Sequence, residues 1–111
     1  PPMRSKARDG FCPIGPRVVA RHEIADATAL GVRVFVDGLL VHRSDTSGWI
    51  RSPERLLAEV SDFMTLLPGD VLMTGVAHGA PKVHAGQRVA IEIDGLGRLE
   101  NAFVAAQGTG A

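Results

Sequence analysis

The sequence predicts a β-rich α+β fold, a mixed β-sandwich or barrel-like roll with one main helix. Thirteen glycines and seven prolines interrupt the 111 residues at short intervals, which favours many short strands over long helices. Apolar side chains at helical spacing occur over residues 53–64. Two turn-then-strand units, at residues 68–74 and 85–93, favour a barrel-like or sandwiched sheet over alternating βαβ units.

The strands are expected in the following order. Arg17–Arg21 alternates weakly and is a candidate first strand. Gly31–Val36 has the β-branched and aromatic content of a strand, and Asp37-Gly38 suits a two-residue type I′ turn that returns the chain as Leu39–Arg43. Further strands are expected at Val71–Thr74, Arg88–Ile93 and Arg98–Val104.

The helix has a clear start signal. Ser52 can cap it, Pro53 fits its first turn, and Glu54 complements the positive end of the helix dipole. One apolar face then follows at helical spacing, formed by Leu56, Leu57, Val60, Phe63 and Met64. The sequence therefore predicts a helix from Pro53 to about Met64.

Composition excludes several classes of partner. Twelve basic residues balance twelve acidic ones, so we expect no nucleic-acid partner and no membrane-surface partner. No apolar run approaches the roughly 20 residues that span a bilayer, and no signal peptide is visible. Cys12 is the single cysteine, so a reducing, cytoplasmic setting is expected. Because the sequence starts Pro1-Pro2 without a methionine, we expect that further residues precede Pro1 in the gene product or that the chain is stabilised by a partner.

Two segments could carry chemistry. Lys6 and Asp9 precede a stiff turn, where a lysine charge could stabilise a carboxylate or an enolate; a solvated surface pair is the alternative. Thr74-Gly75 ends a strand and opens the loop 76–84, where backbone amides could bind a carboxylate; an ordinary strand-to-loop glycine is the alternative.

Other polar residues have a structural interpretation beside a functional one. Asp45-Thr46-Ser47 could contact substrate or could be turn chemistry. Cys12, between Phe11 and Pro13, is expected to be a buried small hydrophobe. His78 and His84, in the loop after Thr74, could bind a metal, but no third ligand at a sensible spacing is visible. His22 and His42 are isolated, and the histidines are expected on the surface.

Several ordered motifs resemble those of the fumarylacetoacetate hydrolase superfamily. Residues 6–16 (KARDGFCPIGP) resemble the family's lysine, its aspartate three residues later and its Cys-Pro-x-Gly-Pro turn. Residues 63–75 (FMTLLPGDVLMTG) resemble the signature F-x-T-L-x-P-G-D-x-x-x-T-G, and residues 45–47 resemble the N-T-S loop. The resemblance covers essentially all of the chain. The sequence motifs at residues 8–16 and 74–81 are most similar to those of the bifunctional isomerase/decarboxylases of homoprotocatechuate breakdown, in their N-terminal half or subunit.

The resemblance implies a fold of the fumarylacetoacetate hydrolase C-terminal domain type, with residues 1–111 as the C-terminal part of one catalytic domain. It implies a metal-dependent decarboxylase/isomerase of unsaturated 2-oxo dicarboxylic or tricarboxylic acids in 4-hydroxyphenylacetate/homoprotocatechuate catabolism. Mg²⁺ or Mn²⁺ would chelate the small-molecule 2-oxo acid, and a homodimer is expected. The implied site residues are a catalytic lysine, Lys6, and the substrate-binding residues Thr74, Gly75, Val76, Asp45 and Thr46.

Two departures from the family pattern bear on that function. The family's metal ligands, a Glu-x-Glu pair and a later aspartate, are expected upstream of this chain, and Glu92-Ile93-Asp94 does not replace them. Val76 stands where the family usually has a threonine, which removes a donor to substrate. An acylpyruvate-type C–C bond hydrolase is one alternative, although no histidine here matches its general base. A non-catalytic partner subunit or fragment is another, and the 111 residues alone are expected to be inactive.

Overall fold

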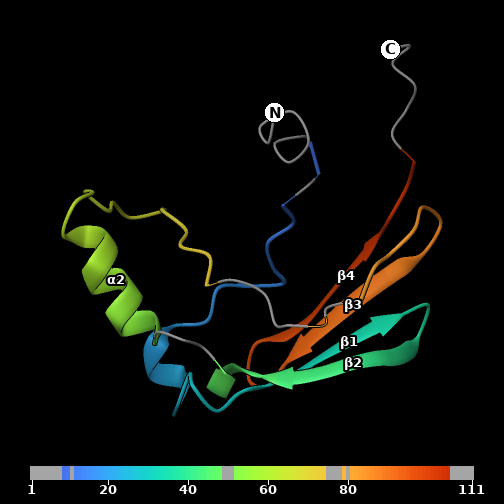
Figure 1. The fold of residues 1–111 in the computed structure, drawn as a ribbon, viewed down its shortest axis with the longest axis horizontal. Coiled ribbons are helices and arrows are strands. Elements are labelled where there is room, and N and C mark those ends of the chain that lie inside the picture. The colour runs from blue at the N-terminus through green and yellow to red at the C-terminus, as the bar shows by residue number, and fades with distance from the viewer. Residues whose placement is uncertain (1–8, 11, 49–51, 75–78, 80, 106–111) are drawn as a thin grey trace.

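The computed structural model describes residues 9–10, 12–48, 52–74, 79 and 81–105 (Figure 1). Four strands form one sheet in the order β2-β1-β3-β4, and every neighbouring pair is antiparallel. The elements are the 3₁₀ turn η1 (Arg21–Glu23), β1 (Gly31–Val36), β2 (Leu39–Asp45), the 3₁₀ turn η2 (Thr46–Gly48), α2 (Pro53–Ser61), β3 (Arg88–Ile93) and β4 (Gly97–Ala102). This sheet and its one α-helix confirm the predicted fold class.

The β1–β2 hairpin confirms the most local of the sequence predictions. Asp37 has φ 50° and Gly38 has φ 84°, the pair of positive values that a type I′ turn requires. The side chain of Asp37 also accepts a hydrogen bond from the backbone N–H of Arg88, 2.9 Å away, and so ties the turn to β3. The register shifts between Val34 and Phe35, where β2 carries one extra residue, Val41.

The helix begins as predicted and ends early. Ser52 accepts a hydrogen bond at 3.2 Å from the N–H of Arg55, which confirms the cap. The predicted end at Met64 is wrong, because α2 stops at Ser61 and the N–H groups of Phe63 and Met64 both bond to the carbonyl of Val60. The side chains of Phe63 and Met64 are 75% and 54% exposed, so no burial holds them in a longer helix.

Two predicted strands are absent from the described residues. Residues 71–74 and 17–20 are extended or irregular and pair with no described strand. Val71 and Met73 are exposed, and Val18 is 91% exposed, so their apolar content is not buried against a neighbour. The chain instead turns at Ala20, whose carbonyl accepts from the N–H of Glu23 to start η1. The last strand is also shorter than predicted, Gly97–Ala102 rather than Arg98–Val104.

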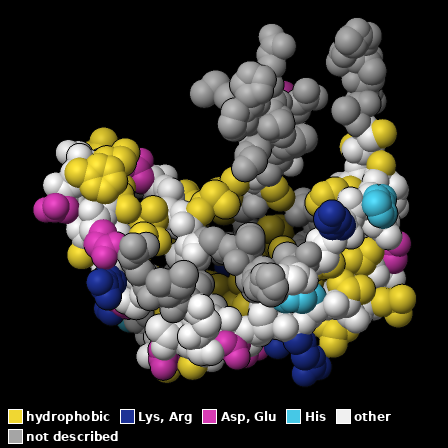
Figure 2. All heavy atoms as spheres, in the orientation of Figure 1, with side chains coloured by type: hydrophobic (Ala, Val, Ile, Leu, Met, Phe, Trp, Pro, Cys, Tyr) yellow, Lys and Arg dark blue, Asp and Glu magenta, His cyan; other side chains and the backbone are white. Residues whose placement is uncertain are grey.

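The two faces of the sheet differ in chemistry. One face carries an aliphatic row, and the other carries linked ion pairs in which Arg33 and Arg98 share Glu92. The Arg98 guanidinium lies 5.0 Å from the ring centroid of Phe35, and Ala90, the strand partner of Phe35, is 2% exposed. Figure 2 shows further hydrophobic side chains at the surface over α2 and over the sheet. Among the described residues, no helix is long and apolar enough to cross a membrane.

Candidate functional site

The predicted site residues fall into two groups. Lys6, Gly75 and Val76 lie outside the described residues. The structure places Asp45 at the end of β2, Thr46 at the start of η2, and Thr74 in the extended segment that follows the turn at Leu67–Asp70. Asp45 and Thr74 are exposed, whereas Thr46 is 7% exposed.

Asp45 stabilises the turn that follows β2. Its Oδ1 accepts hydrogen bonds from the hydroxyl of Ser47 and, at 3.0 Å, from the N–H of Ser47. These two bonds hold the pKa of the Asp45 carboxyl below its ordinary value. These contacts are hydrogen bonds within a turn, which is the structural interpretation of Asp45 that the sequence offered beside substrate contact.

Thr46 joins the end of β2 to the loop that precedes β1. Its hydroxyl donates to the carbonyl of Ala27 at 2.6 Å and accepts from the N–H of Leu30 at 3.0 Å. The backbone N–H of Thr46 also donates to the carbonyl of Leu30. Because the hydroxyl of Thr46 donates its proton to the carbonyl of Ala27, Thr46 stabilises the conformation of the loop.

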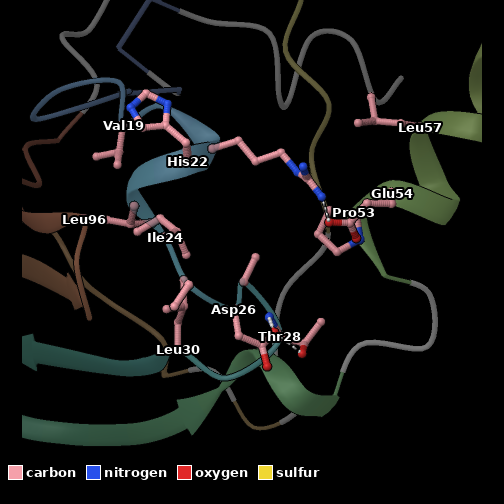
Figure 3. Close-up of a pocket in the computed structure, with 13 residues that line it drawn as sticks. Val19, His22, Ile24, Asp26, Thr28, Leu30, Pro53, Glu54, Leu57 and Leu96 are labelled. Carbon is pink, nitrogen blue, oxygen red and sulfur yellow. Dashed lines mark hydrogen bonds and ion pairs between the residues drawn. The ribbon is translucent and has the colours of Figure 1, made fainter.

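That loop forms one wall of a cavity of about 580 Å³ between η1, residues 24–30 and the start of α2. Figure 3 shows apolar side chains converging on it from these elements. The guanidinium of Arg21 and the carboxylate of Glu54 lie 3.3 Å apart and connect η1 to α2 across the cavity. Of the predicted site residues that the structure describes, Asp45, Thr46 and Thr74, none lines this cavity, but Thr46 bonds to Ala27 and Leu30, which do.

Little in the sequence predicted this cavity. Its apolar lining comes from three separate segments, residues 19–30, residues 53–57 and Leu96, and the weak alternation of residues 17–21 indicated a strand. The lining offers an apolar surface with an ion pair, a histidine and Asp26. Asp26 accepts two bonds from Thr28, which lower the pKa of its carboxyl. The described lining can hold an apolar group.

Residues 75–78 and 80 of the loop predicted after Thr74 lie outside the described residues, which include Gly79. Gly79 has φ 80°, a backbone conformation that favours glycine. A Cβ atom at Gly79 would lie 3.8 Å from Nε2 of His42 on β2. His42 is half-buried, His22 and His84 are exposed as expected, and His78 lies outside the described residues.

The described residues do not form a metal site. They contain no group of three or more histidine, cysteine, aspartate or glutamate side chains that could hold an ion. Glu92 and Asp94 both lie within 3.4 Å of Arg33, so these carboxylates take part in ion pairs. Cys12 is exposed, which corrects the prediction that it is buried, because its turn lies at the surface with Ile14 66% exposed.

Comparison with known families identifies the chain. The model of the fumarylacetoacetate (FAA) hydrolase C-terminal family matches residues 1–104. The chain belongs to this family. The match includes the motifs at residues 6–16 and 63–75 on which the resemblance rested.

Relatives of this FAA hydrolase family chain are enzymes with different reactions. The 4-hydroxyphenylacetate degradation bifunctional isomerase/decarboxylase of Salmonella dublin is 42% identical over 104 residues, which are 94% of this chain and 24% of that relative. The mitochondrial oxaloacetate tautomerase fahd2 of Xenopus laevis is 42% identical over 109 residues, 92% of this chain and 34% of that relative.

A solved structure confirms the fold of the FAA hydrolase family chain. Maleylpyruvate hydrolase from Sphingobium sp. SYK-6, in complex with manganese(II) ion and pyruvate, superposes with a TM-score of 0.83 at 31% identity. The superposition covers 89% of this chain and 38% of that chain. The chain thus spans between about a quarter and two fifths of the proteins it matches.

Proposed function

We propose that the protein carrying this chain is a metal-dependent decarboxylase/isomerase of unsaturated 2-oxo dicarboxylic or tricarboxylic acids in aromatic catabolism. The observation that carries the proposal is the 42% identity over 104 residues to a 4-hydroxyphenylacetate degradation bifunctional isomerase/decarboxylase. Decarboxylation and double-bond isomerisation of a 2-oxo acid share one requirement, since both pass through an enolate that must be stabilised.

The roles proposed for this chain are binding and charge stabilisation. Lys6 supplies a positive charge for the carboxylate or enolate of the substrate. Thr74, which is exposed, offers a hydroxyl at the start of the loop, and Gly75 offers a backbone amide. Val76 offers no hydroxyl, so the site lacks one donor that the usual family threonine provides. Asp45 and Thr46 contribute indirectly, since their bonds hold the turn after β2 and the loop at residues 27–30.

The required cation is proposed to be Mg²⁺ or Mn²⁺, held outside this chain. The described residues do not fit a metal ion, because they contain no cluster of ligands. Support comes from the neighbouring maleylpyruvate hydrolase, whose structure is a complex with manganese(II) ion and pyruvate. A divalent cation would supply Lewis-acid polarisation of the 2-oxo group.

We propose that residues 1–111 are the C-terminal part of a single catalytic domain. Large apolar side chains of the described chain are exposed, among them Phe63 (75%), Met73 (73%) and Leu39 (71%). Exposed apolar area on this scale is typical of a surface that other protein covers. The remainder of the domain and the second subunit of the expected homodimer are the proposed cover.

Hydrolysis is the second candidate function. It is favoured by the TM-score of 0.83 to maleylpyruvate hydrolase. Hydrolysis of a C–C bond needs a base that activates water, classically histidine or glutamate. No residue of this chain is proposed for that role, so we rank hydrolysis below decarboxylation and isomerisation. A non-catalytic partner subunit is the third candidate.

A substrate panel separates these candidates. The whole protein, with Mg²⁺ or Mn²⁺, is given unsaturated 2-oxo diacids and acylpyruvates, and products are resolved by mass spectrometry and NMR. Loss of CO₂ or migration of the double bond is the expected result. Cleavage of an acylpyruvate to pyruvate and a free acid would favour the hydrolase. No turnover of any panel member, with either metal, would contradict both enzymatic proposals.

A further inference from the structure

Arg43, on the strand β2, faces another cation. It lies directly opposite Arg33 on β1. The guanidinium of Arg33 is already engaged by Glu92 and Asp94, toward β3. Among the described residues, no hydrogen bond or ion pair engages the exposed guanidinium of Arg43. Because like charges directly opposite each other on two strands are unfavourable, an anionic group from outside the sheet would stabilise Arg43.

Asp62 carries the opposite charge in an equally unfavourable place. It lies at the C-terminal end of α2, where the helix dipole is negative and a carboxylate is destabilising. In the described part of the chain, its exposed carboxylate forms no ion pair or hydrogen bond. A cation supplied from outside α2 would therefore stabilise Asp62.

Exposed apolar side chains lie beside both charges. Phe63 and Met64 follow Asp62 directly, and both are exposed. Residues 39–41, two leucines and a valine, are exposed on the same strand as Arg43. That strand is the outer one of the described sheet, so no described strand pairs with its free edge. We call residues 62–64 the α2 surface, and residues 39–41 with Arg43 the β2 surface.

The two surfaces do not meet within one copy. Figure 1 shows α2 projecting away from the sheet at one end of the longest axis, with the β1–β2 turn at the other end. We propose that they meet between two copies of this chain, with Asp62 of each copy bound to Arg43 of the other. A two-fold axis forms this contact twice, because an isologous interface exchanges equivalent residues. The inference rests on the proposed function, which expects a homodimer, and adds the residues that hold it.

Charge complementarity selects a second copy as the cover of these surfaces. The α2 surface is apolar and acidic, and the β2 surface is apolar and basic. Each surface is the counterpart that the other requires, and one chain supplies both. Pairing them compensates the two unfavourable charges in a single assembly.

Charge reversal in separate chains tests a contact between copies. Asp62→Lys or Arg43→Glu puts like charges at both contacts of a homodimer, whereas a mixed dimer of the two variants restores two attractive pairs. The two variants of the whole protein are co-expressed with different tags, and native mass spectrometry counts the dimers. The mixed dimer should outnumber the two homodimers together by about tenfold, the scale of two exposed ion pairs.

Neither substitution should impair folding of the single copy. A cation at the C-terminal end of α2 suits the helix dipole, and an anion opposite Arg33 pairs with it. Arg21→Glu is the matched control, because the exposed Arg21 pairs with Glu54 of its own copy. Co-expressed with Asp62→Lys, it should give mixed dimers and homodimers in equal, statistical amounts.

The outcomes separate this inference from the proposed function. Statistical amounts in the test mixture would overturn the inference and leave the remainder of the domain as the cover of both surfaces. A monomeric whole protein would overturn it together with the expected homodimer. A dimer that follows the charge reversal but shows no turnover would support the interface and contradict the enzymatic function alone.

Discussion

The hydroxyl of Thr46 donates a hydrogen bond to the carbonyl oxygen of Ala27, 2.6 Å away. The hydroxyl oxygen of Thr46 also accepts a hydrogen bond from the N–H of Leu30 at 3.0 Å, so one side chain fixes both ends of the short loop before β1. Thr46 is 7% exposed and the loop lines the cavity of about 580 Å³. A residue expected to contact substrate therefore acts as a structural link between β2 and a cavity wall.

Removing this hydroxyl should destabilise the protein. Thr46→Val preserves the shape of the side chain but leaves the carbonyl of Ala27 and the N–H of Leu30 without their partner. We expect a loss of about 2 kcal/mol in the free energy of unfolding, the scale of unsatisfied buried polar groups. Urea unfolding measures it. Thr46→Ser keeps the hydroxyl and should lose clearly less; equal losses in the two variants would contradict the hydrogen-bond account.

Local chemistry made some of these elements predictable. Asp37-Gly38 encodes its own turn, and Ser52 with Pro53 encodes the start of α2, because the deciding contacts lie within a few residues. The helix end and the strand expected at Val71–Thr74 depend on what covers those side chains, which the local sequence does not contain. In both cases the local periodicity predicted a longer or additional element, but the side chains are not buried and the element does not form.

The candidate site, like the fold, was predictable from the sequence only in part. The motif around Thr74 predicts a loop from the order of its residues alone, and residues 75–78 of that loop lie outside the described residues. The bonds of Thr46 to Ala27 and Leu30 join positions 16 or more residues apart, and no spacing rule predicts them. The cavity likewise assembles from segments that show no shared pattern.

Substitution of Gly38 should destabilise the protein through the conformation of the backbone alone. Gly38 has φ 84°, and a Cβ atom added there would meet nothing within 4 Å. Gly38→Ala should therefore cost about 1 kcal/mol through the positive φ and not through a clash. Gly48→Ala is the matched control, because Gly48 is equally open and does not have a positive φ. Thermal unfolding of both variants checks this, and equal melting temperatures would contradict it.

Acid should weaken the charged face of the sheet. Bonds from Arg98 and Arg33 lower the pKa of Glu92 from its ordinary value of 4.5, and bonds from Arg88 and Arg98 do the same for Glu100. A carboxyl whose pKa is lower in the folded state stabilises the fold above its unfolded pKa, and this contribution is lost as pH falls through the folded pKa. The free energy of unfolding should be constant above about pH 5.5, one unit above the ordinary glutamate value, and fall below it.

Urea unfolding between pH 7 and pH 3 checks this prediction in the unsubstituted protein and in Glu92→Gln. The variant should show a shallower decline below pH 4.5, the ordinary value for this group. High salt should also reduce the decline, since these side chains are partly exposed and salt screens exposed charges. Identical slopes for both proteins at low salt would show that the Glu92 ion pairs do not contribute.

Lys6 carries the proposed electrostatic stabilisation. In the whole protein with metal, Lys6→Ala should reduce turnover about a hundredfold or more, the usual scale for one lost electrostatic group. Arg55→Ala removes a positive charge from the exposed face of α2, where Arg55 pairs with Glu59, and should leave turnover unchanged. Steady-state kinetics on the same 2-oxo acid compares the two variants. Unchanged kinetics in Lys6→Ala would remove Lys6 from the mechanism.

Enolate formation is the step that the proposed decarboxylation and isomerisation share, and solvent exchange observes it directly. The whole protein is incubated with pyruvate and Mg²⁺ in D₂O, and proton NMR follows the methyl signal. The account predicts loss of that signal well above the rate in buffer with Mg²⁺ alone, and a much slower loss in Lys6→Ala. Exchange at the buffer rate in the unsubstituted protein, with Mg²⁺ and also with Mn²⁺ read out by mass spectrometry, would contradict it and favour a non-catalytic subunit.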